Sequence, residues 1–387
     1  MKKQRSTMKI SLESTKSKHD NPSIIYAVTD TDGTDGPVNQ LIKLMADNDH
    51  PFHRTSEEDE TPTGMIFSDD VVLIKVNSQW DERGGTNTDL VNDLIRVILD
   101  HPEGWMGEII VADNGQAQYG AARKGGSLNW SLNNAVDRTQ SIQDVVDRYS
   151  SHTKISTCLW DEFTGNVVQE FAEGDPEDGF IVNTSVIPST GVMVSYPKFT
   201  TPYGTQVSFK WGIYKPQIND YDVDKLKVIN LPVLKTHMIY GVTGAIKNYM
   251  GVPSDKLTAG LGHRTHNTVG NGGMGTLMAQ TRVPILNIMD AIHVNAKPKD
   301  GPSTPYRGAT ETNIIASSTD PIALDYWASK NILCVACADQ GYETPTLDPD
   351  NKEKKMYGHW LDASMKELNH ENWGFTNDPN RITVHIT

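Results

Sequence analysis

The chain has 387 residues, of which 37% are hydrophobic and 22% charged, a composition typical of a folded globular protein rather than a disordered one. Its 49 acidic residues outnumber 35 basic ones, and the net charge of −14 argues against nucleic acid or anionic membranes as partners unless a local basic patch intervenes. Three cysteines are too few for a disulfide framework, and no apolar run is long enough to span a membrane, so we expect a soluble, cytoplasmic protein.

The first part of the chain differs in character from the rest. Residues 1–20 are polar and basic and lack the apolar stretch of a signal peptide. We predict that residues 1–65 form an N-terminal extension packed on the core. Residues 66–387 are expected to form a single α/β domain. At about 150–225, short apolar pieces alternate with polar residues, which predicts an inserted antiparallel β region.

A strand–helix–strand unit opens the core. The β-branched run from Val71 to Val76 is typical of a strand buried on both faces. Thr88 can cap the next helix, and Glu108–Ala112 is the second strand of the unit. Such a unit implies a right-handed parallel crossover.

The same pattern returns after the insertion. Strands are predicted at Val228–Leu234, Ile285–Met289 and Asn313–Ser317. Asp320 before Pro321 is a strong helix start. A helix near 359–368 and a short strand at 382–386 complete the prediction. The fold class is therefore α/β, a mostly parallel sheet with flanking helices and an inserted antiparallel β region.

Polar side chains stand where the predicted parallel strands end. The carboxyl ends of such strands meet at one edge of the sheet, where ligands of open α/β folds bind. A single polar residue after a strand is usually a cap or a solvated loop residue, but four strands share the feature here, which favours a common site. The residues are Lys75, Asn77, Asp113, Lys235, His237 and Asp290.

The chemistry of these groups suggests roles. Lysines can hold an anion, and an imidazole or a carboxylate can move a proton. We assign Lys235, His237 and Asp290 as candidate catalytic residues. Standing at exposed strand ends, Lys235 and His237 should be replaceable by Ala with loss of activity but a stability cost below about 1 kcal/mol. Candidate substrate-binding residues are Lys75, Asn77, Asp113, Lys247 and Asn248.

Three further signals are weaker. Lys247 and Asn248 stand between Gly244 and Gly251, and could equally form a solvated helix face with a glycine cap. His263 and His266 could bind a metal or be surface histidines without a role. Cys334 and Cys337 have the spacing of a redox or zinc motif but lack a second pair, so we predict buried structural thiols.

Five blocks of sequence together resemble the family called domain of unknown function 362. The resemblance runs from about Val71 to Asn331. The residues for which it implies site roles are Lys75, Asn77, Lys235, His237, Lys247, Asn248, Asp290, Asp320 and Asp325. Many members of that family carry ferredoxin-like cysteine clusters, but three cysteines cannot hold a four-cysteine cluster, so no iron–sulfur cluster is expected. A more remote likeness, in architecture only, is to the N-terminal domain of nickel-pincer lactate racemases. The blocks are Lys75-Val76-Asn77, Lys235-Thr236-His237, Val242 to Gly251, Asp290-Ala291-Ile292 with Gly301-Pro302, and Asp320 to Asp325.

Three functional hypotheses remain open at the level of sequence. The first is an enzyme acting on a small anionic molecule, a carboxylate or phosphate, by acid–base or metal-assisted chemistry with a divalent metal. The second is a redox or metal-binding protein that works with a separate electron carrier. The third is a small-molecule binding protein without chemistry. The sequence leaves the substrate, the cofactor and the oligomeric state open.

Overall fold

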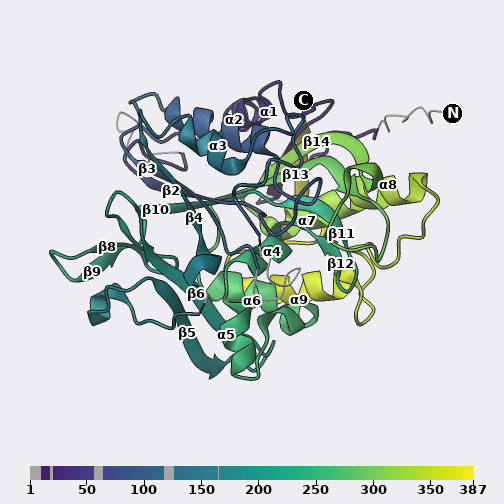
Figure 1. Ribbon diagram of the computed structural model, residues 1–387. Helices are drawn as coiled ribbons and strands as arrows, with labels where there is room; N and C mark the ends of the chain where they lie inside the picture. Colours follow the sequence, from purple (N-terminus) through teal and green to yellow (C-terminus); the bar gives the residue numbers. More distant parts are fainter. Residues whose placement is uncertain (1–9, 18–20, 56–63, 117–125, 164) are drawn as a thin grey trace.

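The computed structural model describes residues 10–17, 21–55, 64–116, 126–163 and 165–387. Its centre is a ten-stranded sheet with helices on both faces (Figure 1). Most neighbouring strands run parallel, and β14 pairs antiparallel with both of its neighbours. In order across the sheet the strands are β15 (Ile382–Ile386), β1 (Ser23–Val28), β14 (Thr310–Ser318), β13 (Leu286–Asn295), β10 (Leu226–Asn230), β2 (Val71–Lys75), β3 (Glu108–Asp113) and β4 (Lys154–Leu159), while β11 (Val233–His237) and β12 (Gly241–Thr243) branch from β13.

Alternation along the buried strands divides the core into two parts. Successive side chains of a strand point to opposite faces, so Val72 and Ile74 join the cluster under one helical layer while Leu73 joins the other. This explains why the sequence reads as an unbroken apolar run. The first layer, at the top of Figure 1, consists of α1 (Pro37–Ala46), α2 (Thr88–Leu99) and α3 (Ile142–Asp147).

The opposite face carries the remaining helices and a second sheet. The second sheet is antiparallel throughout, as predicted for this region. Glu170 joins its strands by accepting hydrogen bonds from Tyr196, Ser208 and Tyr221. The helices are α4 (Ala245–Asn248), α5 (Asp255–Gly260), α6 (Gly273–Gln280), α7 (Pro321–Ala328), α8 (Cys334–Asp339) and α9 (Tyr357–Asn369), and the strands are β5 (Gly179–Val186), β6 (Met193–Thr200), β7 (Gln206–Ser208), β8 (Gly212–Lys215) and β9 (Asp220–Asp222).

The fold class is confirmed: a mixed α/β protein with a mostly parallel central sheet, flanking helices and a separate antiparallel sheet. The predicted helix start at Asp320 is also confirmed, because its Oδ1 accepts hydrogen bonds from the backbone of Ile322 and Ala323. Residues 1–65 were predicted to be an extension packed on the core, and they contain β1, which lies within the main sheet between β15 and β14. In the described part of the chain no helix has the length and apolarity needed to cross a membrane.

Two strand predictions were wrong in extent. The run Val228–Leu234 is not one strand: β10 ends at Asn230 and β11 begins at Val233. Pro232 stands between them, and proline has no N–H to donate to a ladder. The strand predicted to end at Met289 continues to Asn295, so Asp290 lies inside β13, opposite Val233, rather than at a strand end.

Candidate functional site

Lys75 and Asp113 end the neighbouring strands β2 and β3 and bind each other. The Nζ of Lys75 lies 2.6 Å from Oδ1 of Asp113, and both side chains are almost fully buried. Lys75 also donates to the carbonyl of Val76, while Oδ2 of Asp113 accepts from the backbone and hydroxyl of Ser78. Both residues thus have partners within the protein, and neither lines the cavity of about 350 Å³ that Lys235 lines.

Asp290 is also buried away from solvent. Its Oδ2 accepts hydrogen bonds from Nδ2 of Asn134 (2.7 Å) and from the backbone N–H of Asn87 (3.3 Å). Burial raises its pKa to about 6, against the opposing effect of these hydrogen bonds. Asp290 does not line the cavity that Lys235 lines, but its negative charge opposes the lowering of the Lys235 pKa.

A cavity of about 350 Å³ brings the other predicted residues together. It opens where β11 and α4 end, beyond the carboxyl end of the parallel strands, as expected for an α/β sheet. Among the sequence-predicted residues, those that line it are Asn77, Lys235, His237, Lys247, Asn248 and His266.

Two lysines dominate the electrostatics of this cavity. Lys235 is fully buried and Lys247 is only 6% exposed. Lys235 donates a hydrogen bond to the carbonyl of Gly84. Burial, and for Lys235 also the positive charge of Lys247, lowers the pKa of each amine to about 7. The alternative of a solvated helix face at Lys247 is wrong, as is the expectation that Lys235 and His237 stand exposed.

The two histidines are held in neutral form. Nδ1 of His237 lies 3.2 and 3.3 Å from the backbone N–H groups of Ile239 and Tyr240 and accepts from them, so its proton sits on Nε2. Burial and neighbouring positive charge push the pKa of His237 far below its usual range. The same causes lower the pKa of His266 to about 3. Nε2 of His266 lies 3.5 Å from Nζ of Lys247.

A row of asparagines fixes the floor beside the lysines. Asn248 accepts from Asn77 (3.3 Å) and donates to Asn230 (2.8 Å), which in turn donates to Asn287 (2.9 Å). Asn230 and Asn287 are fully buried in neighbouring parallel strands. Sequence reasoning missed both, although each interrupts an apolar run of the sequence, which is the signal that could have revealed them.

Two glycines let α4 approach its neighbours closely. A Cβ on Gly251 would stand 2.1 Å from Oδ1 of Asp113 and 2.4 Å from Nζ of Lys75. A Cβ on Gly244 would stand 2.3 Å from Oδ1 of Asp325, which accepts hydrogen bonds from the first backbone N–H groups of α4. Asp325 and Asp320 are thus helix caps, away from the cavity.

Other lining residues were not predicted from sequence. Arg264 reaches the cavity while its Nε donates to Asp255 at 2.9 Å. No periodic pattern marks it, because it lies in a short loop after α5. The unpredicted lining residues are Gln79, Trp80, Gln116, Met238, Ile239, Thr243, Arg264 and Pro302.

The predicted metal pair does not assemble in the cavity. His266 lines it, whereas His263 is exposed on the loop outside it. Within residues 10–17, 21–55, 64–116, 126–163 and 165–387, no three His, Cys, Asp or Glu side chains are grouped so as to hold a metal. Cys334 and Cys337 are free and buried on α8, where burial raises the pKa of these thiols to about 12 and 11.

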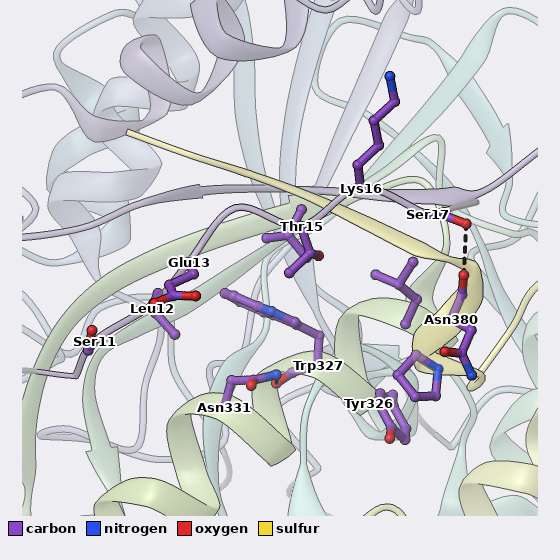
Figure 2. Close-up of a pocket in the computed structure, with 13 residues that line it drawn as sticks. Ser11, Leu12, Glu13, Thr15, Lys16, Ser17, Tyr326, Trp327, Asn331 and Asn380 are labelled. Atoms are coloured by element: carbon purple, nitrogen blue, oxygen red, sulfur yellow. Dashed lines mark hydrogen bonds between the residues drawn. The ribbon is translucent and has the colours of Figure 1, made fainter. Parts of the chain in front are cut away.

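A larger cavity, of about 590 Å³, lies between the N-terminal segment, α7 and β15 (Figure 2). Thr15, Trp327 and Asn331 contribute to its wall, and Figure 2 shows Lys16 extending away from the last two. Charged side chains are few among its lining residues, so it lacks the convergence of titratable groups found beside Lys235 and Lys247.

Part of the cavity lies in a segment that matches a known family. Residues 201–330 match the model described as Domain of unknown function (DUF362). This segment resembles the DUF362 family. The resemblance predicted from sequence is confirmed there, while the block at Lys75 lies outside the matched residues. The matched segment supplies both lysines and both histidines of the cavity, and Asn77 comes from outside it. No curated protein matches the sequence.

Proposed function

We propose that the protein is an enzyme that binds a small carboxylate or phosphate in the cavity beside Lys235 and Lys247. One of these lysines would then move a proton to or from the bound molecule. The observation that carries the proposal is the convergence of two buried amines on one cavity. Among the described residues that line this cavity none is an aspartate or glutamate. A buried ammonium group without an anionic partner is costly, so a bound anion would relieve that cost.

The shared charge of the two lysines suits acid–base catalysis. Each pKa is about 7, and the charge of Lys247 lowers that of Lys235. Near neutral pH, one amine can therefore stay protonated and hold the anion while the other is free to accept a proton. A general base works best when its pKa lies near the operating pH.

The remaining polar groups fit binding better than proton transfer. His237 has its Nδ1 occupied by backbone donors, which leaves Nε2–H as a fixed donor toward an oxygen atom. Asn77 and Asn248 offer amide groups at the same cavity. Arg264 adds a positive charge that Asp255 partly offsets. In this proposal the lysines, rather than His237, move the proton, and Asp290 is a positioning residue.

Binding is tested first, with acetate and inorganic phosphate as probes and isothermal titration calorimetry as the measurement. We expect Lys247→Met to weaken binding of either anion at least tenfold at pH 7, because the variant removes a charge-assisted hydrogen bond. The matched control is Lys354→Met, which removes an exposed lysine and should leave affinity unchanged. Wild-type protein that binds neither anion would refute the proposed anion site.

Proton transfer is tested separately by solvent exchange. The protein is incubated in D2O with a panel of small carboxylates that carry a hydrogen on the carbon next to the carboxyl or carbonyl group. Proton NMR should show loss of that signal with wild-type protein and none with Lys235→Met. Anion binding without any exchange across the panel would instead indicate a binding protein without chemistry.

A further inference from the structure

The mouth of the lysine cavity carries large apolar side chains. Met238 is 55% exposed and Ile239 is 60% exposed, and both line the cavity whose floor holds Lys235 and Lys247. Trp80 and Pro302 line it as well. Single exposed apolar residues are ordinary on protein surfaces, but apolar side chains that line a cavity together with a few polar groups are typical of ligand-binding sites.

Contacts between loops make this rim continuous. A Cβ on Gly84 would stand 2.7 Å from Cβ of Trp80 and 3.2 Å from the carbonyl of Pro302. A Cβ on Gly301 would stand 3.2 Å from Cε of Met238. The loop that carries Trp80 therefore contacts the loop that carries Pro302 at Gly84, and the loop that carries Pro302 contacts Met238 at Gly301.

The rim is tied to the charged floor. The carbonyl of Gly84, in the loop that contacts Trp80 and Pro302, accepts the hydrogen bond of Lys235. On the other side, Nδ1 of His237 accepts from the backbone N–H of Ile239, which fixes the loop that presents Met238 and Ile239. The apolar side chains are therefore held at the mouth by the same residues that face the anion.

We infer that the molecule bound here is amphiphilic: a carboxylate or phosphate joined to an apolar or aromatic group. This inference rests on the proposed function for the anionic part. The anionic group meets Lys235 and Lys247, and the apolar group lies against Trp80, Met238, Ile239 and Pro302. Burial of an apolar group at such a rim adds affinity in proportion to the area removed from water.

A series of carboxylates tests the inference by calorimetry at pH 7. The probes are acetate, butyrate and 3-phenylpropionate, with uncharged 3-phenylpropanamide as the control for charge. We expect 3-phenylpropionate to bind wild-type protein at least tenfold more tightly than acetate, with butyrate between them. The amide should bind at least tenfold more weakly than 3-phenylpropionate because it lacks the charge.

Variants locate the apolar contact. Ile239→Ser should lower the affinity for 3-phenylpropionate at least threefold and leave that for acetate unchanged. The control Ile218→Ser alters an equally apolar, 71% exposed residue outside the cavity and should change neither. If acetate binds but the phenyl group adds nothing, or Ile239→Ser binds both as wild type does, the amphiphilic ligand is refuted and the anion site stands. If neither carboxylate binds, the proposed function fails with it.

Discussion

Two neighbouring regions of this protein bury lysines in opposite surroundings. At the ends of β2 and β3, Lys75 meets the carboxylate of Asp113 at 2.6 Å and does not line the cavity beside Lys235. In β11 and α4, Lys235 and Lys247 line a cavity, and the described residues give neither of them a salt bridge. A lysine with a buried partner contributes to the fold, whereas a buried lysine that faces a cavity without one is available to a ligand.

The largest effect should come from breaking the paired lysine. Lys75→Ala leaves Asp113 buried without its partner, and we expect a loss of about 3–5 kcal/mol in the free energy of unfolding. Urea denaturation followed by circular dichroism measures it. As the control, the double variant Lys75→Met with Asp113→Leu removes both charges and should recover much of that loss. A single variant as stable as wild type would show that the pair does not stabilise the fold.

A methyl group against the same pair should be almost as damaging. In Gly251→Ala the new Cβ would overlap both Asp113 and Lys75, and we expect a loss of about 2–3 kcal/mol in the free energy of unfolding. Gly260→Ala is the matched control, because a Cβ there meets no atom within 4 Å, and its stability should change by less than about 1 kcal/mol. Equal melting temperatures for the two variants would contradict the close packing of α4.

The unpaired lysines should instead make stability rise with pH. The unfolded chain keeps their protons up to pH 10.5, while the folded protein releases them near pH 7, so between these values the unfolded state binds more protons. From pH 7 to 9, Lys247 alone should add about 2 kcal/mol to the free energy of unfolding of wild type. Urea denaturation of Lys247→Met should lack this increment, and Lys354→Met should keep it. Identical pH profiles for wild type and Lys247→Met would exclude a lowered pKa at Lys247.

The smallest effect concerns the ligand. Acetate does not titrate between pH 7 and 9, whereas the lysine that holds it must be protonated. The affinity for acetate should therefore fall by up to tenfold per pH unit above 7, about 1.4 kcal/mol, with uptake of a proton on binding. Calorimetry in buffers of different ionisation enthalpy measures that uptake. Affinity that stays constant up to pH 9 would place the anion away from the two amines.

The sequence predicted the direction of the strands better than the partners of their side chains. Apolar runs followed by Lys75, Asp113 and Lys235 were enough to place these residues at the carboxyl end of one sheet. The runs could not reveal that Lys75 would pair with Asp113, because that depends on which strands become neighbours. They also could not reveal that Met238 and Ile239, in the turn after β11, would line the mouth of the cavity, because a turn has no hydrophobic periodicity.

The mispredicted strand ends have a similar origin. A period of two distinguishes a strand from a helix but does not say where strand pairing stops. The extension of β13 past Asp290 was therefore not predicted. Pro232 was visible in the sequence as a ladder breaker, yet the apolar residues on both sides of it concealed the break. The buried amides of Asn230 and Asn287 are likewise hydrogen-bonded to each other. They lie on strands that are far apart in the chain, so the sequence could not predict this pairing.

The position of β1 has a consequence for how the protein is made. β1 lies between β14 and β15, so its hydrogen-bonding partners are among the last residues of this sequence to be synthesised. At roughly 5–20 residues per second, a ribosome needs on the order of 15 to 60 seconds to travel from Val28 to Thr310. Throughout that interval the apolar run Ile24–Val28 has no neighbouring strand, which makes it a natural target for chaperones that bind extended apolar segments.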